Sequence, residues 1–294
     1  MLMNTEERAA LPDEERLDLI RGQFWIGYPK AKLIQEQMEE LLIYPKSQRM
    51  PNLAIIGETN SGKTLLLRRF CKKHNPPVDA NAEKTQIPVL LIEVPTEPDE
   101  SRLYGEILEV LLAPGSMREP VEARVRRIQH LLRAVETKII ILDEFQNALA
   151  GSPVKLRRFL NSIKYLGNTL QIPIVVAGTP ETLNVLRADP QMSNRFPPAV
   201  ISKWTYDESY LRLLASIETY LPLRNPSNLI EEKTARRILE LSEGTIGEIV
   251  SLLRVLAKDA IKVGREKIDF DSLKVAYLKN LGWVIPSERS RYSR

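Results

Sequence analysis

The sequence contains one cysteine, Cys71, and no long apolar run, and these two scarcities exclude several classes of protein. A single thiol excludes the intramolecular disulfide framework that stabilises small exported domains. The longest apolar runs, such as "KIIILD", end after a few residues, whereas a helix needs about 20 such residues to cross a bilayer. The N-terminus also lacks the basic and then apolar segment of an export signal. We therefore expect a cytoplasmic protein with no membrane partner.

A large excess of charge is also lacking, because the formal net charge is only +4. The arginines nevertheless cluster, in "REPVEARVRRIQHLLR" (118–133) and "KLRRFLNSIK" (155–164). Clustered cations on a nearly neutral chain favour a polyanionic partner, and the solvated faces of amphipathic helices explain them equally well. The chain is long enough to bury a large core. Its 294 residues with 43% apolar content predict one large domain or two unequal ones.

Residues 57–64 read "GETNSGKT" and match the G-x-x-x-x-G-K-[ST] pattern of a phosphate-binding loop. The match lies between "NLAII", an apolar run of strand length, and "LLLRRF", which is typical of a helix. Glycines let such a loop turn its amide groups toward phosphate oxygens, and the helix N-terminus adds a partial positive charge. Lys63 would reach the β- and γ-phosphates of ATP, and the Thr64 hydroxyl would hold Mg²⁺. The residues predicted to bind the nucleotide are Gly57, Glu58, Thr59, Asn60, Ser61, Gly62, Lys63 and Thr64.

A second candidate element is "KIIILDEF" (138–145), in which four apolar residues precede two acids. The apolar residues predict a strand buried on both faces of a parallel sheet, and the acids then lie at its carboxyl end, where α/β sheets bind ligands. Asp143 would hold the metal ion, and Glu144 would act as general base on the attacking water. Thr179 ends another predicted strand, "QIPIVVAGT" (171–179), and is a candidate for sensing the γ-phosphate or the water.

Further strands are predicted at "IPVLLIEV" (87–94) and "PAVISKW" (198–204), and stretches of helical length separate the apolar runs. This alternation predicts an α/β fold with a doubly wound parallel sheet. Toward the C-terminus, apolar residues recur at helical spacing and predict a bundle of roughly four helices. The segments of this bundle are 206–221, 229–244, 246–264 and 271–283.

The order of the phosphate loop, the acidic strand end, Thr179 and "SNRF" (193–196) resembles that of an AAA+ ATPase. The resemblance implies a P-loop AAA+ core with a C-terminal helical lid. It also makes Arg195 the arginine finger that reaches the γ-phosphate bound by the neighbouring subunit. The upstream "FWIGYPKA" (24–31) resembles the segment that lines the adenine pocket. The residues implied to lie near the base are Ile26, Gly27 and Tyr28.

More narrowly, "WIGYPKA", "RMPNLAIIGETNSGKT", "LDEFQNAL" and "GTIGEI" together resemble the TniB and TnsC ATPases, which select targets for DNA transposons. The resemblance runs from about residue 20 to about residue 280. Gly247 stands where many AAA+ proteins carry a sensor-2 arginine, a substitution that is usual in TniB and TnsC ATPases. We expect an N-terminal arm (1–20), an ATPase core (21–204) and a helical lid with a short tail (205–294).

The same resemblance implies that subunits assemble head to tail into a homo-oligomeric filament on double-stranded DNA, with contacts mostly to the DNA backbone. Ser152 and Pro153 predict the start of a helix after the acidic strand. Helical spacing leaves Lys155, Arg158 and Ser162 away from its buried stripe. Without a visible base-reading pattern, sequence-independent binding is expected. The candidate DNA-binding residues are Arg102, Ser116, Arg118 and Lys155.

Two functional hypotheses from different classes remain. The first is an ATP-controlled platform that forms a filament or ring on target DNA, recruits a transposase beside a TniQ-like target-selecting adaptor, and disassembles when ATP is hydrolysed. The second is a small P-loop kinase or remodelling ATPase that acts on another substrate. A kinase needs no finger from a neighbouring subunit, so Arg195 favours the first. Within the AAA+ class, a helicase loader or replication initiator is the alternative.

Overall fold

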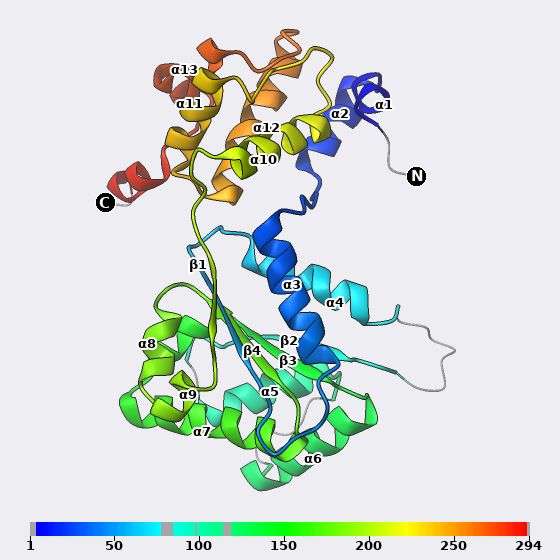
Figure 1. The fold of residues 1–294 in the computed structure, drawn as a ribbon, viewed down its shortest axis with the longest axis vertical. Coiled ribbons are helices and arrows are strands. Elements are labelled where there is room, and N and C mark those ends of the chain that lie inside the picture. Colours follow the sequence, from blue (N-terminus) through cyan, green and yellow to red (C-terminus); the bar gives the residue numbers. More distant parts are fainter. Residues whose placement is uncertain (1–3, 78–84, 98, 114–118, 293–294) are drawn as a thin grey trace. The chain divides into compact units, whose positions relative to one another are not determined.

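The structure, a computed structural model, describes residues 4–77, 85–97, 99–113 and 119–292 (Figure 1). Contacts within the chain divide it into two units. The sheet unit comprises Lys30–Ile201. The helical unit joins the chain up to Pro29 to the chain from Ser202 onward.

Within the described residues, five parallel strands form the sheet, in the spatial order β2-β3-β4-β1-β5. The register pairs Ile56 of β1 with Gly178 of β4, and Leu142 of β3 with Val176 of β4. The carboxyl ends of these three strands therefore lie at one edge of the sheet. The doubly wound parallel sheet predicted from the sequence is confirmed, although the strands predicted at 87–94, 171–179 and 198–204 are each shorter than predicted. The strands are β1 (Leu53–Gly57), β2 (Val89–Glu93), β3 (Ile139–Asp143), β4 (Ile174–Gly178) and β5 (Pro198–Ile201).

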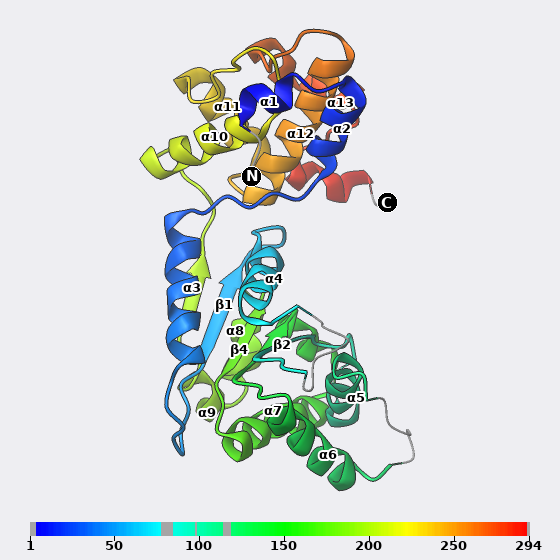
Figure 2. The ribbon, with the colours of Figure 1, turned by 90° about the vertical axis from the view of Figure 1, so that its right-hand side faces the viewer.

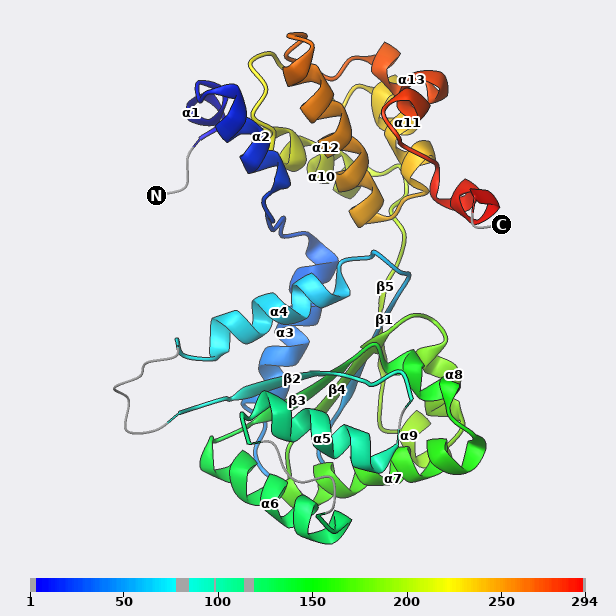
Figure 3. The ribbon, with the colours of Figure 1, turned by 180° about the vertical axis from the view of Figure 1, so that it is seen from behind.

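Helices cover both faces of the sheet, with α3 and α4 on one face and α5, α6 and α7 on the other (Figure 3). Alternate strand residues such as Leu90 and Ile140 pack with α5, α6 and α7 in one apolar cluster. Strand residues of the opposite parity, such as Ile55 and Ile141, are fully buried as well. The strands read as unbroken apolar runs for this reason. The helices are α3 (Pro29–Leu42), α4 (Lys63–His74), α5 (Glu100–Val110), α6 (Val121–Ala134), α7 (Pro153–Leu170), α8 (Thr182–Arg187) and α9 (Pro190–Ser193), with a 3₁₀ turn η1 (Phe145–Ala150).

The helical unit has its own apolar core, in which Leu213, Ile238 and Leu253 are buried. The segment predicted at 271–283 divides into a 3₁₀ turn and a short helix, because Lys274 between them is extended. Among the described residues, the helices are too short or too polar to span a bilayer. The elements of this unit are α1 (Thr5–Ala9), α2 (Asp13–Arg21), α10 (Glu208–Tyr220), α11 (Glu232–Ser242), α12 (Ile246–Lys262), α13 (Val275–Asn280), η2 (Phe270–Leu273) and η3 (Pro286–Tyr292).

A buried ion pair joins the N-terminal segment to the helical unit, where α2 lies beside α12 (Figure 2). The fully buried guanidinium of Arg16 donates to both carboxylate oxygens of Glu266, at 2.7 and 2.8 Å. This contact holds the pKa of Glu266 below its usual range. Such a bidentate pair is among the stronger side-chain contacts in proteins, so the segment is a fixed part of the unit.

The boundaries of the two units differ from those expected from the sequence. Residues 21–29 were expected in the ATPase core, and their contacts place them in the helical unit. The physical reason is apolar packing, since Phe24 and Ile26 pack against the core of that unit. Trp204, expected to close the ATPase core, packs against the same helical core.

Candidate functional site

The phosphate loop connects β1, which ends at Gly57, to α4, which begins at Lys63. Its backbone turns back on itself, since the Ser61 amide donates to the Glu58 carbonyl at 3.1 Å. Gly62 has a φ of 85°, in the left-handed region that only glycine adopts without steric penalty. The loop therefore has the strand, turn and helix N-terminus on which phosphate binding depends.

The Lys63 side chain is buried against this loop, with an exposed fraction of 5%. Its Nζ donates to the carbonyl oxygens of Gly57 and Glu58, at 2.8 and 2.9 Å. Burial lowers the pKa of Lys63, and the nearby carboxylates of Glu144 and Asp143 act in the opposite direction. The one cationic side chain of residues 57–64 is thus held at the loop, beside the acids that end β3.

The two residues predicted to hold the metal ion lie in direct contact. The Thr64 hydroxyl donates to Asp143 Oδ2 at 2.7 Å, and Asp143 is only 4% exposed. The other oxygen, Asp143 Oδ1, accepts the Glu144 amide at 2.9 Å. A hydroxyl and a carboxylate are hard oxygen donors, and Mg²⁺ in nucleotide sites takes one or two such ligands together with phosphate oxygens and water. The residues present therefore fit a magnesium ion.

Glu144 has an unusual backbone at the end of β3, with φ and ψ of 54° and 39°. The left-handed region costs a residue with a side chain roughly 1 to 2 kcal/mol, and such conformations concentrate at functional sites. The following Phe145 is fully buried, which fixes the turn. This turn brings the half-buried Glu144 to the edge of the sheet where the phosphate loop also lies.

Sequence reasoning missed Gln146, which contacts both remaining candidates at this edge. Its Nε2 donates to the Glu144 carboxylate, and its Oε1 accepts the Thr179 amide at 3.1 Å. The structure thus brings together the phosphate loop, Asp143, Glu144 and Thr179 around the carboxyl ends of β1, β3 and β4. A glutamine two residues after an acidic pair carries no strong signal by itself, because its partner lies 33 positions away.

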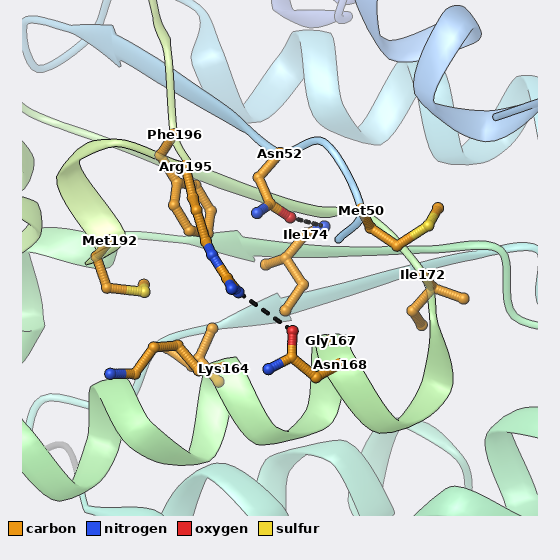
Figure 4. Close-up of a pocket in the computed structure, with 11 residues that line it drawn as sticks. Met50, Asn52, Lys164, Gly167, Asn168, Ile172, Ile174, Met192, Arg195 and Phe196 are labelled. Atoms are coloured by element: carbon orange, nitrogen blue, oxygen red, sulfur yellow. Dashed lines mark hydrogen bonds between the residues drawn. The ribbon is translucent and has the colours of Figure 1, made fainter. Parts of the chain in front are cut away.

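Arg195 lies apart from this group, in the connection between α9 and β5 (Figure 4). Its guanidinium donates to Asn168 Oδ1 on α7 at 3.1 Å. It lines a small pocket with Asn52 and Ile174, which lie at the amino ends of β1 and β4. The phosphate loop follows the opposite, carboxyl end of β1, about 15 Å away for a five-residue strand. Arg195 is therefore remote from the phosphate loop of its own chain.

The implied adenine-pocket residues belong to the helical unit. Tyr28 is buried, and its ring meets Trp204 edge to face with centroids 5.2 Å apart. Burial raises the pKa of Tyr28 to about 12. Ile26 packs against the helical core, and Gly27 lies between these two residues. The proximity of these three residues to a base stays a prediction.

The candidate DNA-binding residues differ in their surroundings. Arg102 donates to Glu97 at 2.8 Å, so its charge is partly neutralised. Lys155 and Arg158 are exposed on α7. Ser162 was predicted on this polar side and is instead buried, and its hydroxyl is satisfied there by donating to the carbonyl of Phe159 one turn earlier. Ser116 and Arg118 lie outside the described residues.

Comparison with known proteins gives a family match and a set of similar folds. A family model described as bacterial TniB protein matches residues 16–206. None of the curated proteins matches the chain. Among solved structures, Cdc6p from Pyrobaculum aerophilum is 18% identical, with a TM-score of 0.60 over 85% of this chain and 67% of that one.

Two structures from Aeropyrum pernix are similar in the same way. The ORC2 protein with ADPNP and ADP is 16% identical, with a TM-score of 0.61 over 92% of this chain and 73% of that one. The ORC1 protein in complex with DNA is 16% identical, with a TM-score of 0.60 over 94% of this chain and 71% of that one. At these identities the likeness shows the fold alone, which is the α/β P-loop fold of AAA+ proteins.

Proposed function

The chain belongs to the bacterial TniB family, and from this membership we propose that it is an ATP-dependent regulator of DNA transposition. It assembles head to tail on double-stranded target DNA, recruits a transposase beside a TniQ-like adaptor, and leaves the DNA when ATP is hydrolysed. The observation that carries this proposal is the group of Lys63, Thr64, Asp143 and Glu144 at one edge of the sheet. This group suits the binding and hydrolysis of a nucleoside triphosphate.

Each residue of the group has one task in this proposal. The amide groups of the phosphate loop and the Lys63 ammonium bind the phosphates, and the Thr64 hydroxyl and the Asp143 carboxylate hold Mg²⁺. Glu144 takes a proton from the attacking water. Bound Mg²⁺–ATP supplies the phosphoanhydride bond whose cleavage ends the assembled state. Thr179, at the end of β4, senses whether the γ-phosphate is present.

The place of Arg195 supports assembly from several subunits. A finger at the amino edge of the sheet is too far from its own phosphate loop and suits the loop of a neighbour. This contact joins two different surfaces, and such heterologous contacts propagate into a ring or an open filament. The nucleotide then lies between subunits, so its hydrolysis weakens the contact that holds the assembly together.

An AAA+ helicase loader or replication initiator is the second candidate function. The likeness to Cdc6p and the ORC proteins favours it. The ORC1 structure contains DNA, and the ORC2 structure contains nucleotides. The family match over residues 16–206 favours the transposition regulator.

DNA binding by this protein is expected to be nearly independent of sequence and to weaken steeply with salt, because contacts with phosphates release counterions. Replacing Arg102, Arg118 and Lys155 together with alanine should make the plot of log affinity against log salt shallower by roughly two units, at about one unit per lost contact. The loss is less than three units because Glu97 partly neutralises Arg102. Fluorescence anisotropy with labelled duplexes of two unrelated sequences measures both properties.

A matched control distinguishes the loss of a local DNA contact from the effect of a lower net charge on the whole protein. Lys46 is exposed and precedes β1, at the amino edge of the sheet, whereas Lys155 starts the helix that follows the carboxyl edge. Lys46→Ala should leave the salt dependence unchanged, and Lys155→Ala should reduce it. Equal slopes for the wild type and the triple variant would place the DNA-binding surface elsewhere.

A further inference from the structure

One side chain, Gln146, connects the candidate general base to the end of a neighbouring strand. Its amide nitrogen donates to the Glu144 carboxylate, and its amide oxygen accepts the backbone N–H of Thr179 at 3.1 Å. The two partners follow β3 and β4, which lie side by side in the sheet. A single amide therefore bridges the two chain segments that carry the candidate catalytic residues.

Gly178, the last residue of β4, has no side chain and so leaves room for the Gln146 amide. A Cβ at Gly178 would fall inside van der Waals contact with Gln146 Oε1 and with Thr182 Oγ1, and 3.2 Å from the Phe145 amide. A side chain at Gly178 would therefore displace the Gln146 amide from this position. Phe145, fully buried just before Gln146, fixes the backbone from which the amide extends.

Because both ends of the amide are bound, the bond to Glu144 has a defined direction. We propose that Gln146 is a positioning residue for hydrolysis: it holds the Glu144 carboxylate in the orientation from which it accepts a proton from water, and ties that orientation to the end of β4. This role rests on the proposed ATPase function. A neutral amide donor suits the task, because it orients a carboxylate without protonating it. A general base acts only within about 2.6 to 3.2 Å of its proton donor, so a carboxylate free to rotate is seldom in place.

The Gln146 bridge also connects two steps that hydrolysis requires, the sensing of the γ-phosphate and the orientation of the general base. Thr179 is the residue proposed to sense the γ-phosphate, and its amide is bound by the same side chain that orients Glu144. A displacement of the end of β4 is therefore transmitted to the base through one side chain of fixed length. The consequence is that Glu144 is oriented for catalysis only when the end of β4, with Thr179, is in its position beside β3.

Two substitutions at Gln146 separate the two ends of the bridge. Gln146→Glu keeps an acceptor for the Thr179 amide, removes the donor to Glu144, and places a like charge against it. Gln146→Ala removes both contacts. Both variants should lower kcat for ATP hydrolysis by about tenfold or more, since general base catalysis contributes about 10²- to 10⁴-fold. KM and the affinity for a fluorescent ATP analogue should change by less than about twofold, because nucleotide binding depends on the phosphate loop.

A second measurement needs no nucleotide. The Thr179 amide should exchange its hydrogen faster in Gln146→Ala and as slowly as in the wild type in Gln146→Glu, because only the first loses the acceptor. Asn147→Ala is the matched control, since it removes the neighbouring amide, which donates to the Val94 carbonyl at 2.8 Å. Its kcat should equal that of the wild type. Thermal unfolding checks that all variants are folded.

Two results would overturn the role of Gln146 alone. One is a wild-type kcat in both variants, and the other is a loss of kcat matched by equal losses of nucleotide affinity and thermal stability, which would mark a purely structural residue. A wild-type protein that binds ATP and never hydrolyses it, with or without DNA, would instead contradict the proposed function and this role with it. The two failures are therefore distinguishable.

Discussion

Lys63→Ala should lower the affinity for ATP by about 100-fold or more and abolish nucleotide-dependent assembly on DNA. A charge-assisted hydrogen bond contributes about 1.5 to 3 kcal/mol, so losing the two that Lys63 would make to the β- and γ-phosphates costs about 3 kcal/mol or more. Lys63 is also the one cation among residues 57–64. Its Nζ already lies at the loop, on the carbonyl oxygens of Gly57 and Glu58. Titration with a fluorescent ATP analogue measures the affinity.

The control for this experiment is Lys72→Ala, at the other end of the same helix, where the side chain is exposed. It removes the same charge from α4 and should bind ATP like the wild type. Circular dichroism shows whether both variants keep the native fold. Unchanged ATP affinity in a folded Lys63→Ala protein would contradict the assignment of the phosphate loop.

Arg195→Ala should leave ATP binding by the monomer nearly unchanged and lower DNA-stimulated hydrolysis by about 10³-fold or more, the effect expected of an arginine finger. The physical reason is the distance between the guanidinium and its own phosphate loop, which lie at opposite edges of the sheet. Release of phosphate under conditions of full DNA occupancy measures the rate. Arg187→Ala, an exposed arginine at the end of α8, is the matched control and should hydrolyse ATP normally.

Mixing two inactive variants tests whether the finger acts between subunits. Glu144→Gln keeps Arg195 and binds ATP, whereas Arg195→Ala keeps the base and lacks the finger. In an equal mixture that assembles at random, about a quarter of the head-to-tail contacts join an intact site to an intact finger. Hydrolysis should therefore recover to about that fraction of the wild-type rate. Mixtures that co-assemble on DNA and stay inactive would contradict a role for Arg195 in the neighbouring site.

Much of the sheet unit could be predicted because its elements are encoded locally. The strand before Asp143 reads as four consecutive apolar residues, and parallel strands covered on both faces require such runs. The phosphate loop could be recognised in the same way, because its glycines precede Lys63 at a fixed spacing within one short segment. The strand predicted at 198–204 was too long, because β5 ends at Ile201 and the chain from Ser202 onward belongs to the helical unit.

Contacts between distant parts of the sequence account for what could not be predicted. Arg16 pairs with Glu266, 250 positions away, and this contact makes the N-terminal segment a fixed part of the helical unit. Gln146 meets Thr179 only because β3 and β4 are neighbours in the sheet. Ser162 satisfies its hydroxyl within its own helix, so it can be buried despite its polarity. None of these pairings follows from composition or periodicity.

In the proposed function, the ATP-bound state forms the assembly on DNA and ATP hydrolysis disassembles it. Glu144→Gln separates these two steps, because the variant keeps the side-chain shape and the contact between Thr64 and Asp143 while removing the base. The deciding measurement is the lifetime of protein–DNA complexes, formed with ATP, after dilution into buffer without ATP. We expect a longer lifetime for Glu144→Gln than for the wild type. A lifetime no longer than that of the wild type would contradict it.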